Sequence, residues 1–214
     1  MEFTEKVAII TGSAQGIGKE MALSFSKEGA KVVIADLNLE KAEETVKEIK
    51  QQGGIAVAIK TDITDMDSIK NLVKETQECF GKKIDILANV AGVCIQEDIF
   101  ESTEKSWDLT MDINLKGMFF LSKEVAKIMA EFKKGKIINI SSGAGSRGFP
   151  GNAAYSASKG AINAFSQALA GEVRKNGIAV NVLSPAHVDT EMHRQTKEDN
   201  PLVAATILCL SRMW

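Results

Sequence analysis

Cysteine, histidine and proline are scarce in this chain of 214 residues, which contains three, two and three of them, respectively. The cysteines, Cys79, Cys94 and Cys209, form no pair at metal-ligand spacing. We therefore expect free thiols and predict neither a disulfide framework nor a metal site.

Long apolar runs and a charge excess of one sign are also absent. No run approaches the ~18 apolar residues of a membrane span, and residues 1–6 lack the apolar core of a signal peptide. The 26 basic residues nearly balance the 28 acidic ones, for a formal charge of −2. This composition predicts a cytoplasmic protein that contacts no membrane and binds no nucleic acid.

Short apolar runs and longer amphipathic segments alternate along the whole chain. The apolar runs have the length of buried parallel strands and cover residues 7–11, 31–36, 55–60, 84–88, 136–141 and 178–184. Helical periodicity marks the segments between them, at 17–28, 39–52, 66–80, 104–132 and 153–175. The pattern predicts an α/β fold, a doubly wound parallel (Rossmann-like) sheet, in a single domain spanning residues 1–214.

A glycine-rich turn joins the first expected strand to the first expected helix. It reads Gly12-Ser13-Ala14-Gln15-Gly16-Ile17-Gly18. Such glycines permit a tight turn, close approach of a pyrophosphate and close packing of the helix, whose N-terminus attracts phosphate. Three residues separate Gly12 from Gly16, where the usual dinucleotide motif has one, and a glycine-rich turn without function is the alternative.

Asp36 ends the second expected strand, 18 residues past Gly18. A carboxylate there can accept hydrogen bonds from the adenosine ribose and repels a 2′-phosphate, which favours NAD over NADP. Gln15 supplies no cation for such a phosphate, whereas Lys19 is able to. The structural alternative for Asp36 is a helix N-cap, since a helical run follows Asn38.

Tyr155, the only tyrosine, precedes Lys159 by four residues, which places both on one face of a helix. An ammonium group near a phenol lowers the phenol's pKa from about 10, which suits acid–base catalysis. Ser142 follows the fifth expected strand, at the edge where parallel sheets bind ligands. A surface Tyr/Lys pair on an amphipathic helix is the alternative.

With these motifs together, residues 7–192 resemble the short-chain dehydrogenase/reductase family, in its compact single-domain branch. The resemblance implies a catalytic set of Asn114, Ser142, Tyr155 and Lys159. It implies cofactor contacts from Gly12, Gln15, Gly16, Ile17, Gly18, Asp36, Asp62, Ile63, Asn89, Gly92, Tyr155, Lys159, Pro185, Val188 and Thr190. Pocket candidates are Val93, Cys94, Gly143, Ala144, Asn152 and His187.

Several of these residues also have purely structural interpretations. Asn114 can be a solvent-facing or backbone-bonded amide, and Ser142 can simply end a strand. Asp62 and Thr190 can cap helices, and Asn89 can stabilise a turn.

The sequence departs from the family pattern at three places. After the fourth strand it reads Asn89-Val90-Ala91-Gly92, where the family has a second asparagine, and after the sixth it reads Pro185-Ala186, where the family has Pro-Gly. The substrate segment, residues 185–214, is short, and the family's last strand is expected to be missing.

The resemblance implies an NAD-linked oxidoreductase that interconverts a secondary alcohol and a ketone, a small-molecule substrate, with Tyr155 as general acid–base. The alternative is a catalytically impaired nucleotide-binding protein or scaffold, because of the short C-terminal segment. A sugar-nucleotide epimerase shares the tyrosine–lysine pair and ranks low without a larger substrate region. Related enzymes pair through the two long helices, so we expect a homodimer or homotetramer.

Overall fold

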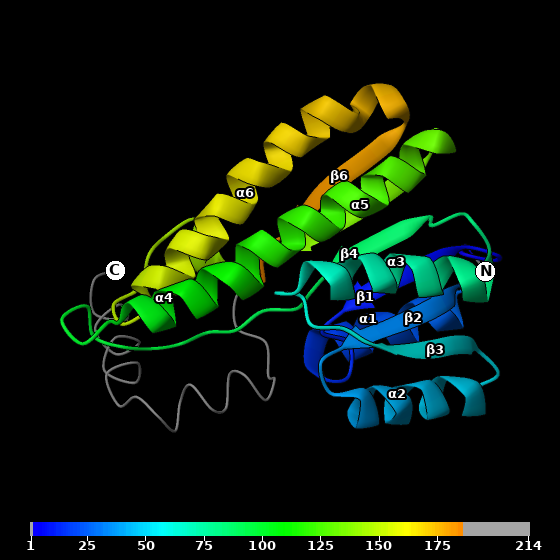
Figure 1. Ribbon diagram of the computed structural model, residues 1–214, viewed down its shortest axis with the longest axis horizontal. Coiled ribbons are helices and arrows are strands. Elements are labelled where there is room, and N and C mark those ends of the chain that lie inside the picture. Colours follow the sequence, from blue (N-terminus) through cyan, green and yellow to red (C-terminus); the bar gives the residue numbers. More distant parts are fainter. Residues whose placement is uncertain (1, 186–214) are drawn as a thin grey trace, which may run out of the picture.

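Six parallel strands form one sheet in the computed structural model, which describes residues 2–185 (Figure 1). The strands are β1 (Val7–Thr11), β2 (Lys31–Asp36), β3 (Ile55–Lys60), β4 (Ile86–Asn89), β5 (Gly135–Ile140) and β6 (Ile178–Leu183). Their order is β3-β2-β1-β4-β5-β6. Strands β2 and β3 are added on one side of β1, and β4, β5 and β6 are added on the other side, so the strand order reverses between β1 and β4. Open parallel sheets bind ligands at such a position. The predicted fold class is confirmed.

Helices cover both faces of this sheet. They are α1 (Gly16–Lys27), α2 (Leu39–Gln51), α3 (Met66–Phe80), α4 (Glu104–Met111), α5 (Met118–Glu131) and α6 (Ala153–Val173), with a π-helical segment η1 (Asp112–Gly117) and 3₁₀ turns η2 (Gly143–Gly145) and η3 (Arg174–Asn176). Helices α1 and α2 pack on one face, and α3, α5 and α6 pack on the other. Figure 1 shows α4 and α5 in one line with α6 beside them.

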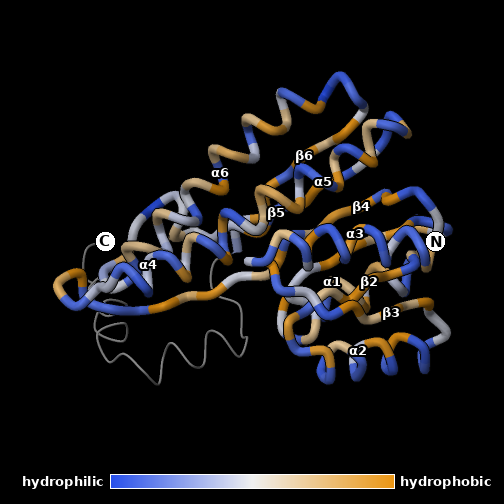
Figure 2. The backbone as a smooth tube through the Cα atoms, in the orientation of Figure 1, coloured by the Kyte–Doolittle hydropathy of each residue, from blue (hydrophilic) through white to orange (hydrophobic). Residues whose placement is uncertain are grey.

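Alternating strand residues build the two apolar layers. Ile9 and Val33 face α3 and α5, whereas Ile10 and Ile34 face α1 and α2, and all four are fully buried. The strands are therefore apolar on both faces, as expected for a parallel sheet covered on both sides. In Figure 2 the strands are mainly hydrophobic in colour, while α2 is hydrophilic on the side away from the sheet.

The predicted bounds agree with the structure to within two residues, except at a break in the longest predicted helix. The fourth strand begins at Ile86 rather than Ile84, since the preceding Asp85 carboxylate pairs with Lys6 and Lys83 at 3.2 and 2.8 Å and accepts the Val7 N–H. The expected continuous helix 104–132 is interrupted by η1. Within residues 2–185, no helix combines the length and the apolar character that a bilayer crossing requires.

Candidate active site

The glycine turn after β1 is tight because each of its three glycines lacks a side chain. Gly12 and Gly16 have φ angles of +61° and +56°, which L side chains rarely adopt. A Cβ on Gly12 would lie 2.8 Å from the Ala91 Cα, and one on Gly18 would lie 2.2 Å from the Gly12 carbonyl oxygen. The turn thus packs closely against residue 91 and against the start of α1.

The N-terminus of α1 keeps its backbone donors directed out of this turn. Its N-cap residue is Gln15, whose side chain makes no capping hydrogen bond. The first N–H groups of a helix have no intrahelical partner and carry the positive end of the helix dipole. Together with the glycines, these donors form a backbone cradle of the kind that attracts anions.

Asp36 connects the glycine turn to the beginning of α2. Its Oδ2 accepts a hydrogen bond from the Ala14 N–H at 3.0 Å, and its Oδ1 accepts one from the Asn38 N–H at 3.0 Å. The N-cap of α2 is Asn38, whose Oδ1 accepts the Lys41 N–H at 3.0 Å. Asp36 is therefore not the helix cap, and its carboxylate lies beside the glycine turn as predicted for a ribose-binding acid.

Asp62 and Ile63 lie in the turn after β3. The Asp62 Oδ1 accepts hydrogen bonds from the Thr64 N–H and hydroxyl at 2.8 and 2.7 Å. The N-cap of α3 is Asp65, so the capping alternative for Asp62 is wrong. The Ile63 backbone presses against Gly117, where a Cβ would lie 2.3 Å from the Ile63 oxygen. This contact joins the turn to the π-helical segment.

The side chain of Asn89 points into the protein interior. Its Nδ2 donates to the Ser122 Oγ at 2.9 Å and to the Asn139 Oδ1 at 2.8 Å, and the Asn139 Nδ2 in turn donates to the Ser166 Oγ at 2.8 Å. These four buried side chains connect β4 and β5 with α5 and α6. The Asn89 amide group thus links these elements, and it does not stabilise a turn.

Val90 stands where the family pattern described above has a second asparagine. Its backbone N–H, like that of Ala91, donates to the Thr11 hydroxyl, at 3.0 and 3.1 Å. The Val90 side chain packs against the apolar layer under α1 and α2. These two backbone N–H groups and the Thr11 hydroxyl therefore join the segment after β4 to β1 without a second asparagine.

Asn114 occupies the π-helical segment and is fully buried. Its Oδ1 accepts the Val93 N–H at 2.8 Å, and its Nδ2 donates to the Val93 oxygen at 2.9 Å and to the Ser158 Oγ at 3.0 Å. Single-turn π segments inside α-helices are frequent at functional sites. Of the two structural readings, the backbone-bonded amide is the one observed, and it brings the segment after β4 against α6.

Gly92 lies between Asn114 and Lys159. A Cβ there would lie 3.1 Å from the Asn114 Oδ1 and 3.5 Å from the Lys159 Nζ. Gly92, which was predicted to contact the cofactor, therefore lies beside the residues expected to be catalytic.

Lys159 is almost completely buried, with 4% of its surface exposed. Its Nζ donates to the Ile140 oxygen at 2.9 Å and lies 5.6 Å from the centroid of the Tyr155 ring. Burial lowers the pKa of this ammonium to about 8, against a smaller opposing effect of Cys94. The surface-pair alternative is therefore wrong, because this lysine is an interior group at the carboxyl end of β5.

Tyr155 is the neighbour of Lys159 on α6 and is also largely buried. Burial raises the pKa of the phenol, the charge of an ionised Cys94 raises it further, and a hydrogen bond with Ser142 lowers it. The expectation of a lowered tyrosine pKa is therefore not met in this arrangement. The physical reason is that desolvation disfavours the phenolate, while the Lys159 ammonium is bonded to a backbone oxygen.

Ser142 and Cys94 complete the surroundings of the tyrosine. The Ser142 Oγ accepts the Ala144 N–H at 3.1 Å as the cap of η2, so the hydroxyl can still donate. The Cys94 Sγ donates to the Asn152 Oδ1 at 3.4 Å, and burial raises the pKa of this thiol to about 11. The uncharged side chains of Cys94 and Asn152 thus lie beside Tyr155.

The remaining predicted residues lie at the end of β6. The Pro185 oxygen accepts the Gly143 N–H at 3.0 Å, which places this proline beside the Ser142 loop. His187, Val188 and Thr190 lie outside the described residues, as does the substrate segment beyond Pro185. The predicted loss of a last strand concerns the same part of the chain.

Two residues that the sequence interpretation missed also belong to this region. Ser158 holds the Asn114 amide, and Lys41 contacts the Gln15 side chain with its Nζ 3.2 Å from the Oε1. Neither contact was apparent from the local sequence, because the partners are 44 and 26 residues apart.

Comparison with known proteins agrees with this geometry. Residues 6–201 match the family model described as short chain dehydrogenase. The chain is 44% identical over 192 residues to galactitol 2-dehydrogenase of Agrobacterium fabrum, covering 89% of this chain and 73% of that protein. It is 41% identical over 203 residues to an uncharacterized oxidoreductase of Thermotoga maritima, covering 94% of this chain and 80% of that protein.

A solved structure gives the same result. The crystal structure of a short chain dehydrogenase from Mycobacterium avium matches with a TM-score of 0.83 and 33% sequence identity, covering 87% of this chain and 69% of that one. The sequence match, the sheet order and the grouped polar side chains all support the same family. The chain belongs to the short-chain dehydrogenase/reductase family, whose members are oxidoreductases that use nicotinamide cofactors.

Proposed function

We propose that this protein is an NAD-dependent dehydrogenase or reductase that interconverts a secondary alcohol and the corresponding ketone. The observation that carries the proposal is the position of the Tyr155 ring at the carboxyl end of β5, beside Ser142 and with its centroid 5.6 Å from the Nζ of the buried Lys159. The residues present fit a dinucleotide, because the tight glycine turn leads into an α1 N-terminus without a side-chain cap and the Asp36 carboxylate lies beside it. We further propose that residues 1–214 act as one catalytic domain.

The nucleotide-binding roles follow from the positions of the backbone donors. Gly12, Gly16 and Gly18, with the first turn of α1, would hold the pyrophosphate. Asp36 would accept hydrogen bonds from the ribose hydroxyls, since each carboxylate oxygen can accept another bond beside its backbone N–H. Asp62 and Ile63 would lie on the adenine side, and Gly92, Lys159 and Pro185 on the nicotinamide side.

In this proposal, the protein's side chains transfer one proton to or from the substrate oxygen. A bound nicotinamide would supply or accept the hydride. The Ser142 hydroxyl would position the substrate oxygen, and the Tyr155 hydroxyl would give its proton to that oxygen during ketone reduction. The raised pKa of Tyr155 keeps the phenol protonated at neutral pH, which suits this direction. Lys159 would orient the tyrosine and hold the ribose, and Asn114 would fix the segment that lines the other side.

The test is to remove the phenolic hydroxyl alone. We expect Tyr155→Phe to lower kcat by about 10²–10⁴-fold, the usual contribution of a general acid, while NADH affinity measured by calorimetry stays within twofold. Ser142→Ala should lower kcat as well. Ser146→Ala is its matched control, because Ser146 lies in the same loop with an exposed side chain, and it should leave kcat unchanged.

Two results would contradict the proposal. Retained turnover in Tyr155→Phe would remove the tyrosine from the mechanism. Tight NADH binding without turnover, across a panel of secondary alcohols and ketones, would instead indicate the nucleotide-binding protein without catalysis.

The same proposal includes self-association through α5 and α6. Phe119 is 43% exposed, and its ring centroid lies 5.2 Å from that of Phe120 and 5.1 Å from that of Phe165. The three rings form an aromatic cluster across the two helices. A partly exposed aromatic cluster of this kind is typical of protein interfaces. Sedimentation velocity of the 214-residue chain should give a dimer or tetramer, and a monomer at all concentrations would exclude this part of the proposal.

A further inference from the structure

The N-terminal half of α2 lies against the loop that leads into α1. Thr45 and Lys41 lie four residues apart, on one face of α2. The Thr45 hydroxyl donates to the Ala14 oxygen at 3.3 Å, and the Lys41 ammonium donates to the Gln15 Oε1 at 3.2 Å. This face of α2 therefore places a positive charge beside the glycine turn.

A negative charge lies at the neighbouring position of the same loop. The Asp36 Oδ2 accepts the N–H of Ala14, the residue next to Gln15. One edge of the loop thus carries a carboxylate and an ammonium group against consecutive residues. The partner that Lys41 contacts here is a neutral amide oxygen, so another acceptor can displace it at small cost.

Lys19, the cation considered from sequence, has a different environment. Its Nζ lies 2.8 Å from the Glu48 Oε2, in an ion pair between α1 and α2. An anion near Lys19 would therefore also meet the Glu48 carboxylate. Lys41 is better placed to attract an anion at the rim of the glycine turn.

We propose that Lys41 is a determinant of nucleotide selectivity that acts against Asp36, by attracting the 2′-phosphate of NADP. This inference rests on the proposed function, in which Asp36 faces the adenosine ribose. A phosphate monoester carries about −1.5 to −2 charges at neutral pH and offers strong acceptor oxygens. The Asp36 carboxylate repels that group, and the Lys41 ammonium beside it offsets part of the repulsion. The chain then favours NAD while still accepting NADP.

The test measures binding of nucleotide fragments without nicotinamide, so that activity plays no part. Calorimetry would compare ADP-ribose with 2′-phospho-ADP-ribose for the wild-type chain and for Lys41→Gln. We expect Lys41→Gln to weaken binding of the phosphorylated fragment by about two- to fivefold, the range of exposed charge pairs, and to leave ADP-ribose within about 1.5-fold. The exposed position of Lys41 should allow the variant to fold normally.

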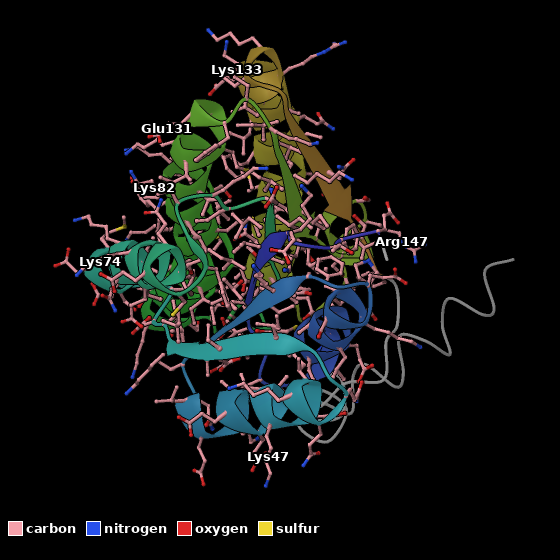
Figure 3. The ribbon with its side chains drawn as sticks, turned by 90° about the vertical axis from the view of Figure 1, so that its right-hand side faces the viewer. Lys47, Lys74, Lys82, Glu131, Lys133 and Arg147 are labelled. Atoms are coloured by element: carbon pink, nitrogen blue, oxygen red, sulfur yellow. The ribbon has the colours of Figure 1, made fainter. Side chains whose placement is uncertain are left out.

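Lys47→Gln is the matched control, because it removes the same charge from the same helix. Lys47 borders the groove between α2 and β3 and points away from the rest of the molecule (Figure 3). It should leave the ratio of the two affinities unchanged. In an Asp36→Asn background the phosphorylated fragment should bind more tightly than in wild type, and adding Lys41→Gln should remove part of that gain.

The outcomes separate this inference from the function on which it rests. If ADP-ribose binds to wild type but Lys41→Gln changes the ratio no more than Lys47→Gln does, the role of Lys41 is overturned and the proposed function stands. If neither fragment nor NADH binds to the wild-type chain, both are overturned.

Discussion

The glycine turn and the surroundings of Tyr155 are built in opposite ways. The glycine turn consists of closely packed backbone, and Gly12 and Gly18 fit there only because they have no Cβ. Around Tyr155 the protein buries polar side chains, among them Asn114, Ser158 and Lys159. A backbone cradle tolerates variation in the residues between its glycines, whereas a buried polar group depends on each of its partners.

The largest expected effect concerns the cradle. We expect Gly18→Ala to lower the free energy of unfolding by about 3 kcal/mol or more, because its Cβ would lie 2.2 Å from the Gly12 oxygen and neither backbone can move freely. Gly171→Ala is the control in α6, where a Cβ meets nothing within 4 Å, and it should stabilise by about 0.5–1 kcal/mol. Urea unfolding measures both. Equal stabilities would mean that the close packing of α1 on the turn is dispensable.

A smaller effect is expected from the buried amide. Asn114→Ala removes three hydrogen bonds from the interior and should lower the free energy of unfolding by about 2–3 kcal/mol. Asn163→Ala is its counterpart, since the Asn163 Nδ2 makes one longer bond of 3.4 Å to the Gly145 oxygen, and it should cost less than about 1 kcal/mol. Similar losses in the two variants would show that burial of the amide contributes little.

The smallest effect is a pH dependence of stability. The pKa of Lys159 is about 8 in the folded protein and 10.5 in an ordinary lysine, so between these values the unfolded chain binds more protons. Stability due to this group therefore rises with pH across that window. Between pH 8 and 10, wild type should gain about 2 kcal/mol relative to Lys159→Met, measured by urea unfolding at each pH. A difference that stays constant with pH would mean that the lysine keeps its ordinary pKa.

The same contrast explains what the sequence could predict. The glycine turn, Asp36 and the six strands are defined by spacing and local composition, and they were located almost to the residue. The π-helical segment was not predicted, because residues 104–132 keep a helical pattern and the irregularity depends on contacts from Val93 and Ser158. These partners are 21 and 44 residues away from Asn114.

The pKa values and buried hydrogen bonds of the site were also not predicted from the sequence. The spacing of Tyr155 and Lys159 correctly predicted that they share a face of α6, and the lysine lies beside the tyrosine ring. Spacing gives no information about desolvation, and desolvation determines the direction of both pKa changes. Likewise, nothing local to Asn89 indicated that its amide would bond to Ser122 and Asn139 inside the protein.

The contact between the glycine turn and residues 90–91 has a consequence for folding kinetics. The wall of the turn comes from a segment about 80 positions later, which docks only when β4 pairs with β1. Contacts of such long sequence separation form slowly, because chain entropy is lost before they are gained. The first three strands can therefore assemble with a complete glycine motif and an incomplete binding surface. Nucleotide-binding competence should appear late in refolding, together with the fourth strand, and well after most of the helical signal.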